Sequence, residues 1–546
     1  MSKKNSAFIT YAPYPALIML IALFFIPLLL TLSQAFFKDG KLTFSIVSEA
    51  FSNPYNLKVL AFTFKQAILS TLLSLLIGLP GAYILARFSF HGKKLLRAIC
   101  TVPFVLPPIL VVLGFVIFYG NSGFLNKLLM ALFNLSEPPL KILYSFQAII
   151  IAHSFYNFPV AMNMVSTALE QLDENCDKAS RTLGASSLRT FLSVTLPRLI
   201  PSILSAATLI FLFCFTSFAV ILVLGGGPQF TTIEVEIYNQ AKRSMNLGSA
   251  SALSIMSMTV CIAFLALNTI VQRHAAAQSR IGATSLSTRR PRLGARILVV
   301  LYIVLLILFV LAPIASVLIR SVLSSSTRSG AKHISFELYR RLTQGSSLQA
   351  IANSLTIALA ASIVSIIMGL ALCISIRRRR SPALEIICML PMSISTVIIG
   401  LGYYIISRLS GQGMSYMLIV LAHVIITLPF VIRTIMPIYR SMPENITNAA
   451  LTLGCTMKQA FLRIELPLLR SAILTSFSFA FAISIGEMNA TLMLSSNTIQ
   501  TIPVVIYRLI NSYNYQGACA LGSILILVCF MVFLISEAAK KRSPYA

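Results

Sequence analysis

Twelve long apolar runs are the strongest constraint on how this chain can fold. A helix of about 20 apolar residues spans the roughly 30 Å of hydrocarbon in a membrane, and each run is long enough to do so. A transmembrane barrel would instead show alternating segments of about ten residues, which this sequence lacks. We therefore predict an all-α integral membrane protein with twelve transmembrane helices, near residues 14–35, 60–86, 98–119, 146–168, 201–224, 251–271, 295–319, 351–376, 383–407, 416–436, 471–492 and 516–538.

The composition excludes three other classes of protein. Of the 546 residues, 57% are hydrophobic and 11% are charged, whereas soluble proteins carry about 25% charged residues. Intrinsic disorder and a water-soluble enzyme are therefore excluded. The 43 lysines and arginines outnumber the 15 acidic residues, but there is little solvated surface on which a nucleic-acid-binding protein could gather this charge. We expect contact with membrane lipid and none with nucleic acid.

The basic residues predict an orientation in the membrane. If the N-terminus is cytoplasmic, 27 basic residues fall in cytoplasmic segments and 14 in outer segments. Cytoplasmic loops of membrane proteins retain lysine and arginine, so we expect both termini in the cytoplasm. The first apolar run is too long for a signal peptide and has no small-x-small cleavage site. We interpret it as the first span.

The sequence contains no motif for a disulfide framework, a metal site or a phosphate-binding loop. The nine cysteines form no C-x-x-C pair and lie mostly in apolar runs, as buried hydrophobic residues do. The phosphate-binding motif G-x-x-x-x-G-K-[ST] does not occur. We therefore predict no disulfide framework, no metal site, no catalytic residues and no cofactor in this chain.

A repeat divides the chain into two parallel halves. Four matches share one offset along the chain: Ala152-His153 with Ala422-His423, Pro159 with Pro429, Gly184 with Gly454, and Leu196-Pro197 with Leu466-Pro467. Large membrane proteins often arise by duplication. We predict a first half of six spans at 1–271, a basic cytoplasmic linker at 272–294, and a second half of six spans at 295–546.

Each half contains one polar loop at the cytoplasmic face, at 170–197 and at 440–467. Each loop is predicted to be a short helix that ends at a glycine, then a second short helix, then a proline where the next span begins. Glycine supplies a turn that other residues resist, and proline can open a helix because the missing N–H has no partner there. Such a loop is too polar to enter lipid.

These loops resemble the cytoplasmic signature of the permease subunits of bacterial ABC importers, which is E-A-A, three residues, G, nine residues, I-x-L-P. The spacer and the final hydrophobic-x-Leu-Pro match in both copies. The triplet matches in part, as Asp177-Lys178-Ala179 in the first half and Asn448-Ala449-Ala450 in the second. The residues that carry the resemblance are Asp177, Lys178, Ala179, Gly184, Leu196 and Pro197, and Asn448, Ala449, Ala450, Gly454, Leu466 and Pro467.

The resemblance implies the type I importer permease fold and a set of partners. In that family the loop inserts a coupling helix into a groove of an ATP-hydrolysing subunit. Two loops imply two copies of a separate ATPase, which binds ATP and magnesium, and a periplasmic or lipid-anchored solute-binding protein. The location implied is the bacterial inner membrane. We expect Asp177 to form an ion pair with the ATPase that Asn448 cannot form.

Further motifs resemble permeases in which both halves are fused, most of all thiamine permeases, with iron(III) permeases next. They include Leu224-Gly-Gly-Gly-Pro-Gln229, Asn157-Phe-Pro159 and Ser484-Ile-Gly-Glu487. The resemblance implies import of thiamine or a related small cation, with iron(III) as the alternative. A proton-coupled secondary transporter also has twelve spans, but it gives no reason for two glycine-broken loops with equal spacing. A scaffold without transport activity explains neither the repeat nor Glu487.

Three polar side chains within the spans are candidates for function. A charged residue inside a membrane costs roughly 2.5–3.5 kcal/mol, so Glu487 should face a helix bundle or a water-filled path. It is either a counter-charge for a cation on the translocation path or a hydrogen-bonded bridge between helices. His153 and His423 occupy equivalent positions. We interpret them as hydrogen-bonding residues between helices rather than as a proton relay or metal ligands.

Overall fold

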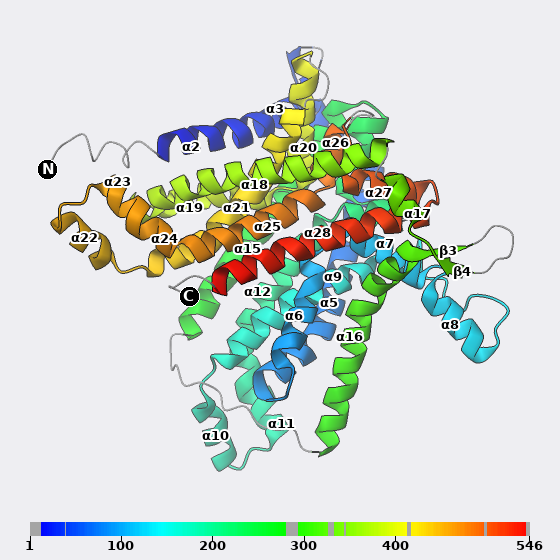
Figure 1. The fold of residues 1–546 in the computed structure, drawn as a ribbon, viewed down its shortest axis with the longest axis horizontal. Coiled ribbons are helices and arrows are strands. Elements are labelled where there is room, and N and C mark those ends of the chain that lie inside the picture. The colour runs from blue at the N-terminus through cyan, green and yellow to red at the C-terminus, as the bar shows by residue number, and fades with distance from the viewer. Residues whose placement is uncertain are drawn as a thin grey trace. The chain divides into compact units, whose positions relative to one another are not determined.

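The structure is a computed structural model that describes residues 13–38, 40–225, 227–279, 293–325, 332–342, 345–379, 381–411, 416–495 and 499–541. Helices dominate it (Figure 1). Among the described residues, ten helices are long and apolar enough to cross a membrane, or up to twelve if each of two bent pairs is one span. The predicted all-α membrane fold is confirmed. Residues 280–292 of the predicted linker lie outside the described part of the chain.

The elements of the first half run from the first span to the sixth. They are α2 (Pro13–Leu20), η1 (Ile21–Phe25), α3 (Ile26–Gln34), β1 (Phe37–Lys38), β2 (Lys41–Leu42), α4 (Ser45–Ser52), α5 (Pro54–Arg87), α6 (Lys93–Val105), α7 (Pro108–Tyr119), α8 (Phe124–Phe133), α9 (Phe146–Glu170), α10 (Glu174–Thr182), α11 (Ser187–Thr190), η2 (Phe191–Thr195), α12 (Leu196–Phe215), α13 (Ala219–Leu224), η3 (Pro228–Phe230), α14 (Ile233–Tyr238), η4 (Asn239–Arg243) and α15 (Leu247–Ser279).

The second half follows the same plan. Its elements are α16 (Leu293–Val322), β3 (Leu323–Ser325), β4 (Lys332–Ile334), α17 (Glu337–Leu342), α18 (Gly345–Arg379), α19 (Pro382–Met389), η5 (Leu390–Ser393), α20 (Thr396–Leu409), α21 (Tyr416–Ser441), α22 (Glu444–Thr452), α23 (Met457–Ala460), η6 (Phe461–Glu465), α24 (Leu466–Leu468), α25 (Arg470–Gly486), α26 (Asn489–Leu494), α27 (Ile502–Asn511) and α28 (Tyr515–Lys541). A short antiparallel hairpin, β1 with β2 and β3 with β4, follows the first span of each half.

Packing divides the chain differently from the sequence repeat. One compact unit, here unit 1, contains Met1–Ala50, Ile237–Ile255 and Ser321–Ala546, and the other, unit 2, contains Phe51–Glu236 and Met256–Arg320. The first span of each half therefore packs into the unit built mainly from the other half. The boundaries predicted at 271 and 295 refer to the repeat along the sequence and not to these packing units. They stay a prediction.

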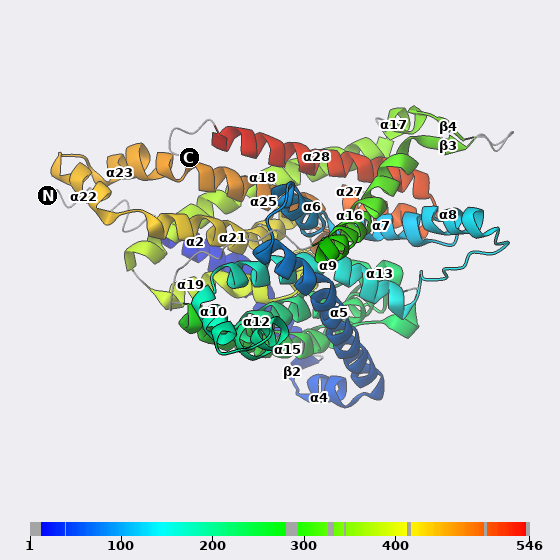
Figure 2. The ribbon, with the colours of Figure 1, turned by 90° about the horizontal axis from the view of Figure 1, so that it is seen from below.

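Unit 2 is built around α5 and α9, with α16 packed against them. Asn53 caps α5 by accepting a hydrogen bond from the Tyr55 backbone N–H at 2.8 Å. On α16, the Tyr302 hydroxyl donates to the Ile77 carbonyl of α5 at 2.6 Å, and the Phe309 ring meets Phe155 of α9 edge to face. Figures 1 and 2 both show α16 beside α9 and α7. These contacts hold the first span of the second half in unit 2.

In unit 1 a tyrosine hydroxyl also holds a first span, here the first span of the chain, by a hydrogen bond to a backbone carbonyl. Pro27 has no N–H, so the carbonyl of Leu23, one turn earlier, lacks its helical partner. The Tyr403 hydroxyl of α20 donates to that carbonyl at 2.8 Å. Gly402 lets the two backbones approach, because a Cβ there would lie 2.6 Å from the Pro27 carbonyl oxygen. A backbone group in hydrocarbon needs such a partner, so the contact fixes α3 on α20.

Four predicted spans are broken rather than continuous. The span predicted at 98–119 is α6 and α7, separated at Pro107, which cannot donate to the helix ladder. The span at 383–407 bends by 88° between Pro382–Ser393 and Thr396–Leu409. Those at 201–224 and 471–492 stop at Phe215 and Gly486 and resume as the short helices α13 and α26. Hydropathy alone cannot show such breaks, because the apolar composition continues through them.

Candidate functional site

Both predicted loops have the same backbone in the structure. In each, a nine-residue helix (α10 or α22) is followed by a glycine turn, a short helix (α11 or α23) and a π-helical turn (η2 or η6) that leads into the next span. Each of these elements in the second loop begins and ends at one constant offset from its counterpart in the first. Gly184 and Gly454 both have φ of 88°. The structure therefore has the predicted turn at both glycines.

The turn closes the first helix of each loop with the same hydrogen bonds. The Ala185 N–H donates to the Ser180 carbonyl at 3.1 Å, and the Cys455 N–H donates to the Ala450 carbonyl at 3.0 Å. This is the pattern of a helix that ends in a left-handed glycine. Just before each glycine, Leu183 is 88% exposed and Leu453 is 86% exposed. Both loops therefore expose a leucine at equivalent tips.

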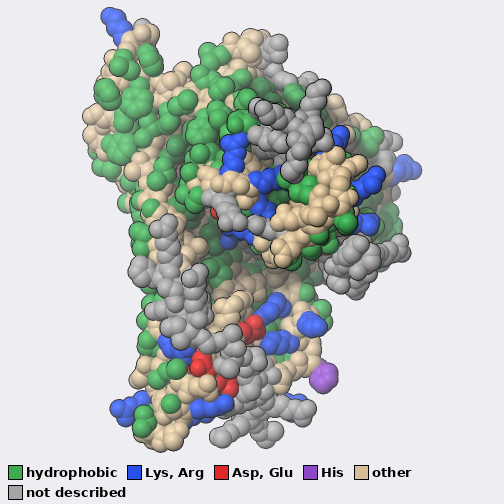
Figure 3. All heavy atoms as spheres, turned by 90° about the vertical axis from the view of Figure 1, so that its left-hand side faces the viewer, with side chains coloured by type: hydrophobic (Ala, Val, Ile, Leu, Met, Phe, Trp, Pro, Cys, Tyr) green, Lys and Arg blue, Asp and Glu red, His purple; other side chains and the backbone are tan. Residues whose placement is uncertain are grey.

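The other predicted residues lie around these turns. Lys178, Ala179, Asn448 and Ala449 are exposed on the helices, whereas Ala450 is buried. Leu196 and Pro197 open α12, and Leu466 and Pro467 open α24, as predicted for the start of the next span. Figure 3 shows many lysine and arginine side chains at the molecular surface, with a few acidic side chains among them.

An ion pair fixes the first loop to the end of a span. Arg87, the last residue of α5, lies 2.6 Å from the Asp177 carboxylate and 3.5 Å from Glu174. The Thr195 hydroxyl of η2 donates to Asp177 at 3.1 Å. Asp177 thus joins α5, α10 and η2, and its side chain is only 14% exposed. We call Arg87, Asp177 and Thr195 the first anchor.

The second loop has an anchor in which acid and hydroxyl have exchanged places. Thr447 on α22 donates to the Glu465 carboxylate of η6 at 2.9 Å. The Tyr439 hydroxyl donates to the other oxygen of Glu465 at 2.7 Å, and Arg378 near the end of α18 lies 3.9 Å from the oxygen that Thr447 contacts. By the offset of the repeat, Thr447 is the counterpart of Asp177, and Glu465 is the counterpart of Thr195. We call Arg378, Thr447 and Glu465 the second anchor.

The predicted equivalence of Asp177 and Asn448 is wrong by one residue. The shared offset of the helices pairs Asp177 with Thr447 and Lys178 with Asn448. Asp177 is moreover engaged within the protein by Arg87, so it is not an open partner for a basic residue elsewhere. Applying the offset of the repeat to every polar residue of the loop would have shown the exchange. Arg87 and Arg378 carry no local sequence signal, because they lie far from the loops in the chain.

Glu487 lies at the break between α25 and α26. Its carboxylate accepts a hydrogen bond from the Ala490 backbone N–H at 3.0 Å and so gives a partner to a free N–H in the first turn of α26, whose N-cap residue is Met488. Beside it, the Asn489 amide donates to the Thr396 hydroxyl of α20 at 2.8 Å. The side chain of Glu487 is half-buried. The structure thus gives Glu487 a role at a helix terminus.

The two histidines join neighbouring helices. His153 of α9 shares a hydrogen bond with Ser70 of α5 at 3.2 Å. His423 of α21 shares hydrogen bonds of 2.8 Å with Ser484 and with Thr491. Both contacts are of the interhelical kind predicted. Within the described residues, no group of three His, Cys, Asp or Glu side chains could hold a metal ion.

Each half of the chain matches one known protein family. The family "binding-protein-dependent transport system inner membrane component" matches at 78–276 and again at 361–543, so each match contains one loop. The thiamine transport system permease protein ThiP of Escherichia coli is 28% identical over 89% of both chains. ThiP of Haemophilus influenzae is 28% identical over 88% of both chains.

A shorter relative matches one half. The putative 2-aminoethylphosphonate transport system permease protein PhnU of Salmonella typhimurium is 28% identical over 46% of this chain and 88% of its own. A relative of that length therefore corresponds to about half of this protein, which agrees with two fused repeats. With both halves matched, the chain belongs to the family of binding-protein-dependent transport system inner membrane components.

Proposed function

We propose that this protein is the membrane permease of an ATP-driven, binding-protein-dependent importer, and that its cargo is thiamine or a closely related small cation. The observation that carries the importer assignment is the pair of loops with equal backbone geometry in a chain that the family matches twice. The relatives named as thiamine permeases, which cover 88% or 89% of this chain, support the cargo.

The proposal gives ATP hydrolysis to a separate subunit. The sequence has no phosphate-binding loop, and each loop presents an exposed leucine beside its glycine turn. Two ATPase subunits would each dock on one loop, at 170–197 and at 440–467, and would hold the ATP and magnesium. The loops and both termini would then lie on the cytoplasmic side, and the solute-binding protein would dock on the outer side.

The anchors explain how movement at a loop reaches the spans. Asp177 fixes α10 to the end of α5 and to the π-helical turn that continues into α12. Glu465 fixes α22 to the end of α18 and to α21. A loop tied to three helices moves with them as one body, so closure of the ATPase subunits would reorient spans rather than bend the loop. Alternation between inward-open and outward-open states would follow.

Uptake by the reconstituted complex tests the proposed function. Proteoliposomes containing the permease with its ATPase should accumulate radiolabelled thiamine only when ATP and the solute-binding protein are both present. A tenfold excess of iron(III) should not compete. Uptake of iron(III) but not thiamine would reject the cargo and keep the importer. Uptake driven by a proton gradient without ATP would reject the importer itself.

Glu487→Gln tests whether the carboxylate acts on the translocation path. The glutamine oxygen can still accept from Ala490, so the first turn of α26 keeps this hydrogen bond, while the negative charge is lost. We expect thiamine uptake to fall about tenfold, because a charge-assisted contact contributes roughly 1.5–3 kcal/mol. The yield of folded protein and the basal ATPase rate should remain unchanged.

Ser217→Ala at the equivalent break is the matched control and should leave uptake near the wild-type rate. If Glu487→Gln instead lowered the yield and left the uptake per molecule unchanged, the side chain would be structural only.

A further inference from the structure

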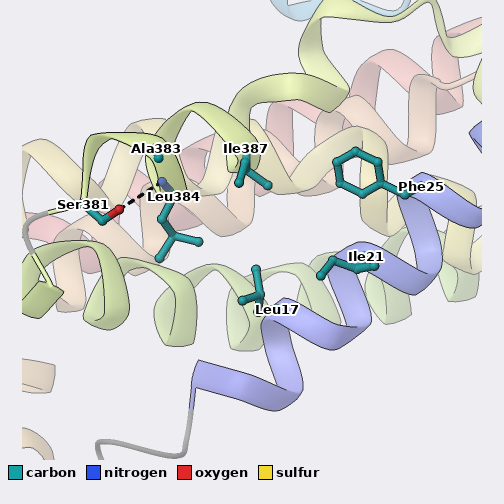
Figure 4. Close-up of a pocket in the computed structure, with 7 residues that line it drawn as sticks. All are labelled: Leu17, Ile21, Phe25, Ser381, Ala383, Leu384 and Ile387. Carbon is teal, nitrogen blue, oxygen red and sulfur yellow. Dashed lines mark hydrogen bonds between the residues drawn. The ribbon is translucent and has the colours of Figure 1, made fainter.

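An apolar groove runs between the first span and α19 within unit 1. Its volume is about 480 Å³. Figure 4 shows the first span on one side of the groove and α19 on the other. The lining residues are Leu17, Ile21 and Phe25 from the first span, and Ser381, Ala383, Leu384 and Ile387 from the segment of α19.

The groove offers a ligand one polar side chain among apolar ones. Ser381 is its one polar lining residue, and the Ser381 hydroxyl accepts the Leu384 backbone N–H at 3.4 Å to cap α19. A space between apolar side chains loses dispersion contacts unless another apolar group fills it. The first span is long and apolar enough to cross a membrane, and α19 belongs to a bent pair that meets the same criterion when taken together, so the apolar group at hand is a lipid acyl chain.

One end of the groove is positively charged. Next to Ser381, α18 ends at Arg377, Arg378 and Arg379. The Arg379 guanidinium lies 4.9 Å from the ring centre of Tyr14, one turn before Leu17 on the first span. A cation thus sits where the two walls of the groove begin.

The charged side chains near Arg379 are engaged with other partners, so the Arg379 guanidinium is available to an anion from outside the chain. Arg377 donates to the Met442 carbonyl at 2.9 Å, and Arg378 belongs to the second anchor. Glu385, the acid on α19, lies 2.7 Å from Arg440. In the part of the chain that the structure describes, no carboxylate is paired with Arg379. The groove therefore combines an apolar channel with a cation at its end, as basic pockets for anionic lipids do.

We propose that this groove binds an anionic phospholipid, with an acyl chain between Leu17 and Leu384 and the phosphate at Arg379. The lipid bridges the first span and α19. This inference does not depend on the identity of the cargo. It assigns a lipid ligand to unit 1, the unit that also contains the loop of α22.

Native mass spectrometry of the purified full chain tests this inference. The protein in detergent is titrated with phosphatidylglycerol and with phosphatidylcholine of the same acyl chains. We expect phosphatidylglycerol to be retained about fivefold better, since one arginine near a headgroup contributes about 1 kcal/mol. Arg379→Gln should remove this preference. Ile21→Trp, which fills the groove, should lower retention of both lipids.

Two control variants separate this site from the general lipid surface. Arg296→Gln removes an exposed arginine at the start of α16, and Leu301→Trp enlarges an exposed residue of the same helix. Both should bind lipid like the wild type. Equal retention of the two lipids by the wild type would overturn the proposal, and so would unchanged retention in both groove variants. Displacement of the lipid by inorganic phosphate alone would also overturn it, because the acyl chain would then contribute nothing.

Discussion

The double substitution Gly184→Val and Gly454→Val is expected to abolish thiamine uptake while ATP hydrolysis continues. Both glycines have φ of 88°, where a β-branched residue is strongly disfavoured. The left-handed conformation costs roughly 1–2 kcal/mol for residues other than glycine. No atom lies within 4 Å of a Cβ built at either position, so the effect comes from the backbone rather than from a clash. The measurement is the number of thiamine molecules imported per ATP hydrolysed.

The control for the glycine variants uses a turn of the same kind elsewhere. Gly40 has φ of 76° and open surroundings, and it lies in the hairpin of β1 and β2. Gly40→Val should bring a similar local cost without loss of coupling. Asparagine adopts the left-handed conformation more readily, so Gly184→Asn with Gly454→Asn should keep much of the uptake. Normal import per ATP in the double valine variant would refute the proposal that the loops couple ATP hydrolysis to transport.

The second large effect is expected at the first anchor, where the repeat itself suggests a rescue. Asp177→Thr removes the closer of the two acids that Arg87 contacts, and we expect the ATPase to bind the permease roughly 10- to 100-fold more weakly, from a loss of about 1.5–3 kcal/mol. Adding Thr195→Glu copies the arrangement of Thr447 and Glu465. The double variant should recover most of the affinity.

The rescue separates the anchor from direct contact with the ATPase. If Asp177 touched the ATPase, an acid at position 195 could not replace it, and the double variant would bind no better than Asp177→Thr. Lys178→Gln is the matched control, because Lys178 is 64% exposed and its partner Glu174 lies 3.6 Å away. An exposed pair contributes little, so this variant should bind nearly as the wild type does. Binding is measured by titrating the ATPase onto permease in nanodiscs.

The sequence predicted features that depend on local pattern. Apolar runs of sufficient length placed the spans, and Gly184 and Gly454 marked the turns, because only a backbone requirement explains glycine at both positions. The constant offset between the two halves was equally visible in the sequence. These signals are each contained within a short stretch of chain, and for that reason one sequence was enough to find them.

Features that depend on tertiary contacts were not visible. Arg87 and Asp177 are 90 residues apart. Because the acid and the hydroxyl exchange places between the two anchors, matching residue types position by position does not show that the anchors are equivalent. The break at Glu487 lies within a continuous apolar stretch. The packing of the first span in unit 1 depends on Pro27 meeting Gly402, and neither residue indicates its partner.

The exchange of first spans has a consequence for synthesis of the protein. Leu23 and Tyr403 are 380 residues apart, and ribosomes add roughly 5–20 residues per second. Roughly 20 to 80 seconds therefore pass between synthesis of the first span and synthesis of α20, the helix that carries Tyr403. During that time the carbonyl that Pro27 leaves unpaired has no tyrosine to satisfy it. Fusion of the two halves keeps the waiting helix tethered to the same chain, so the late partner arrives by translation and not by a search through the membrane.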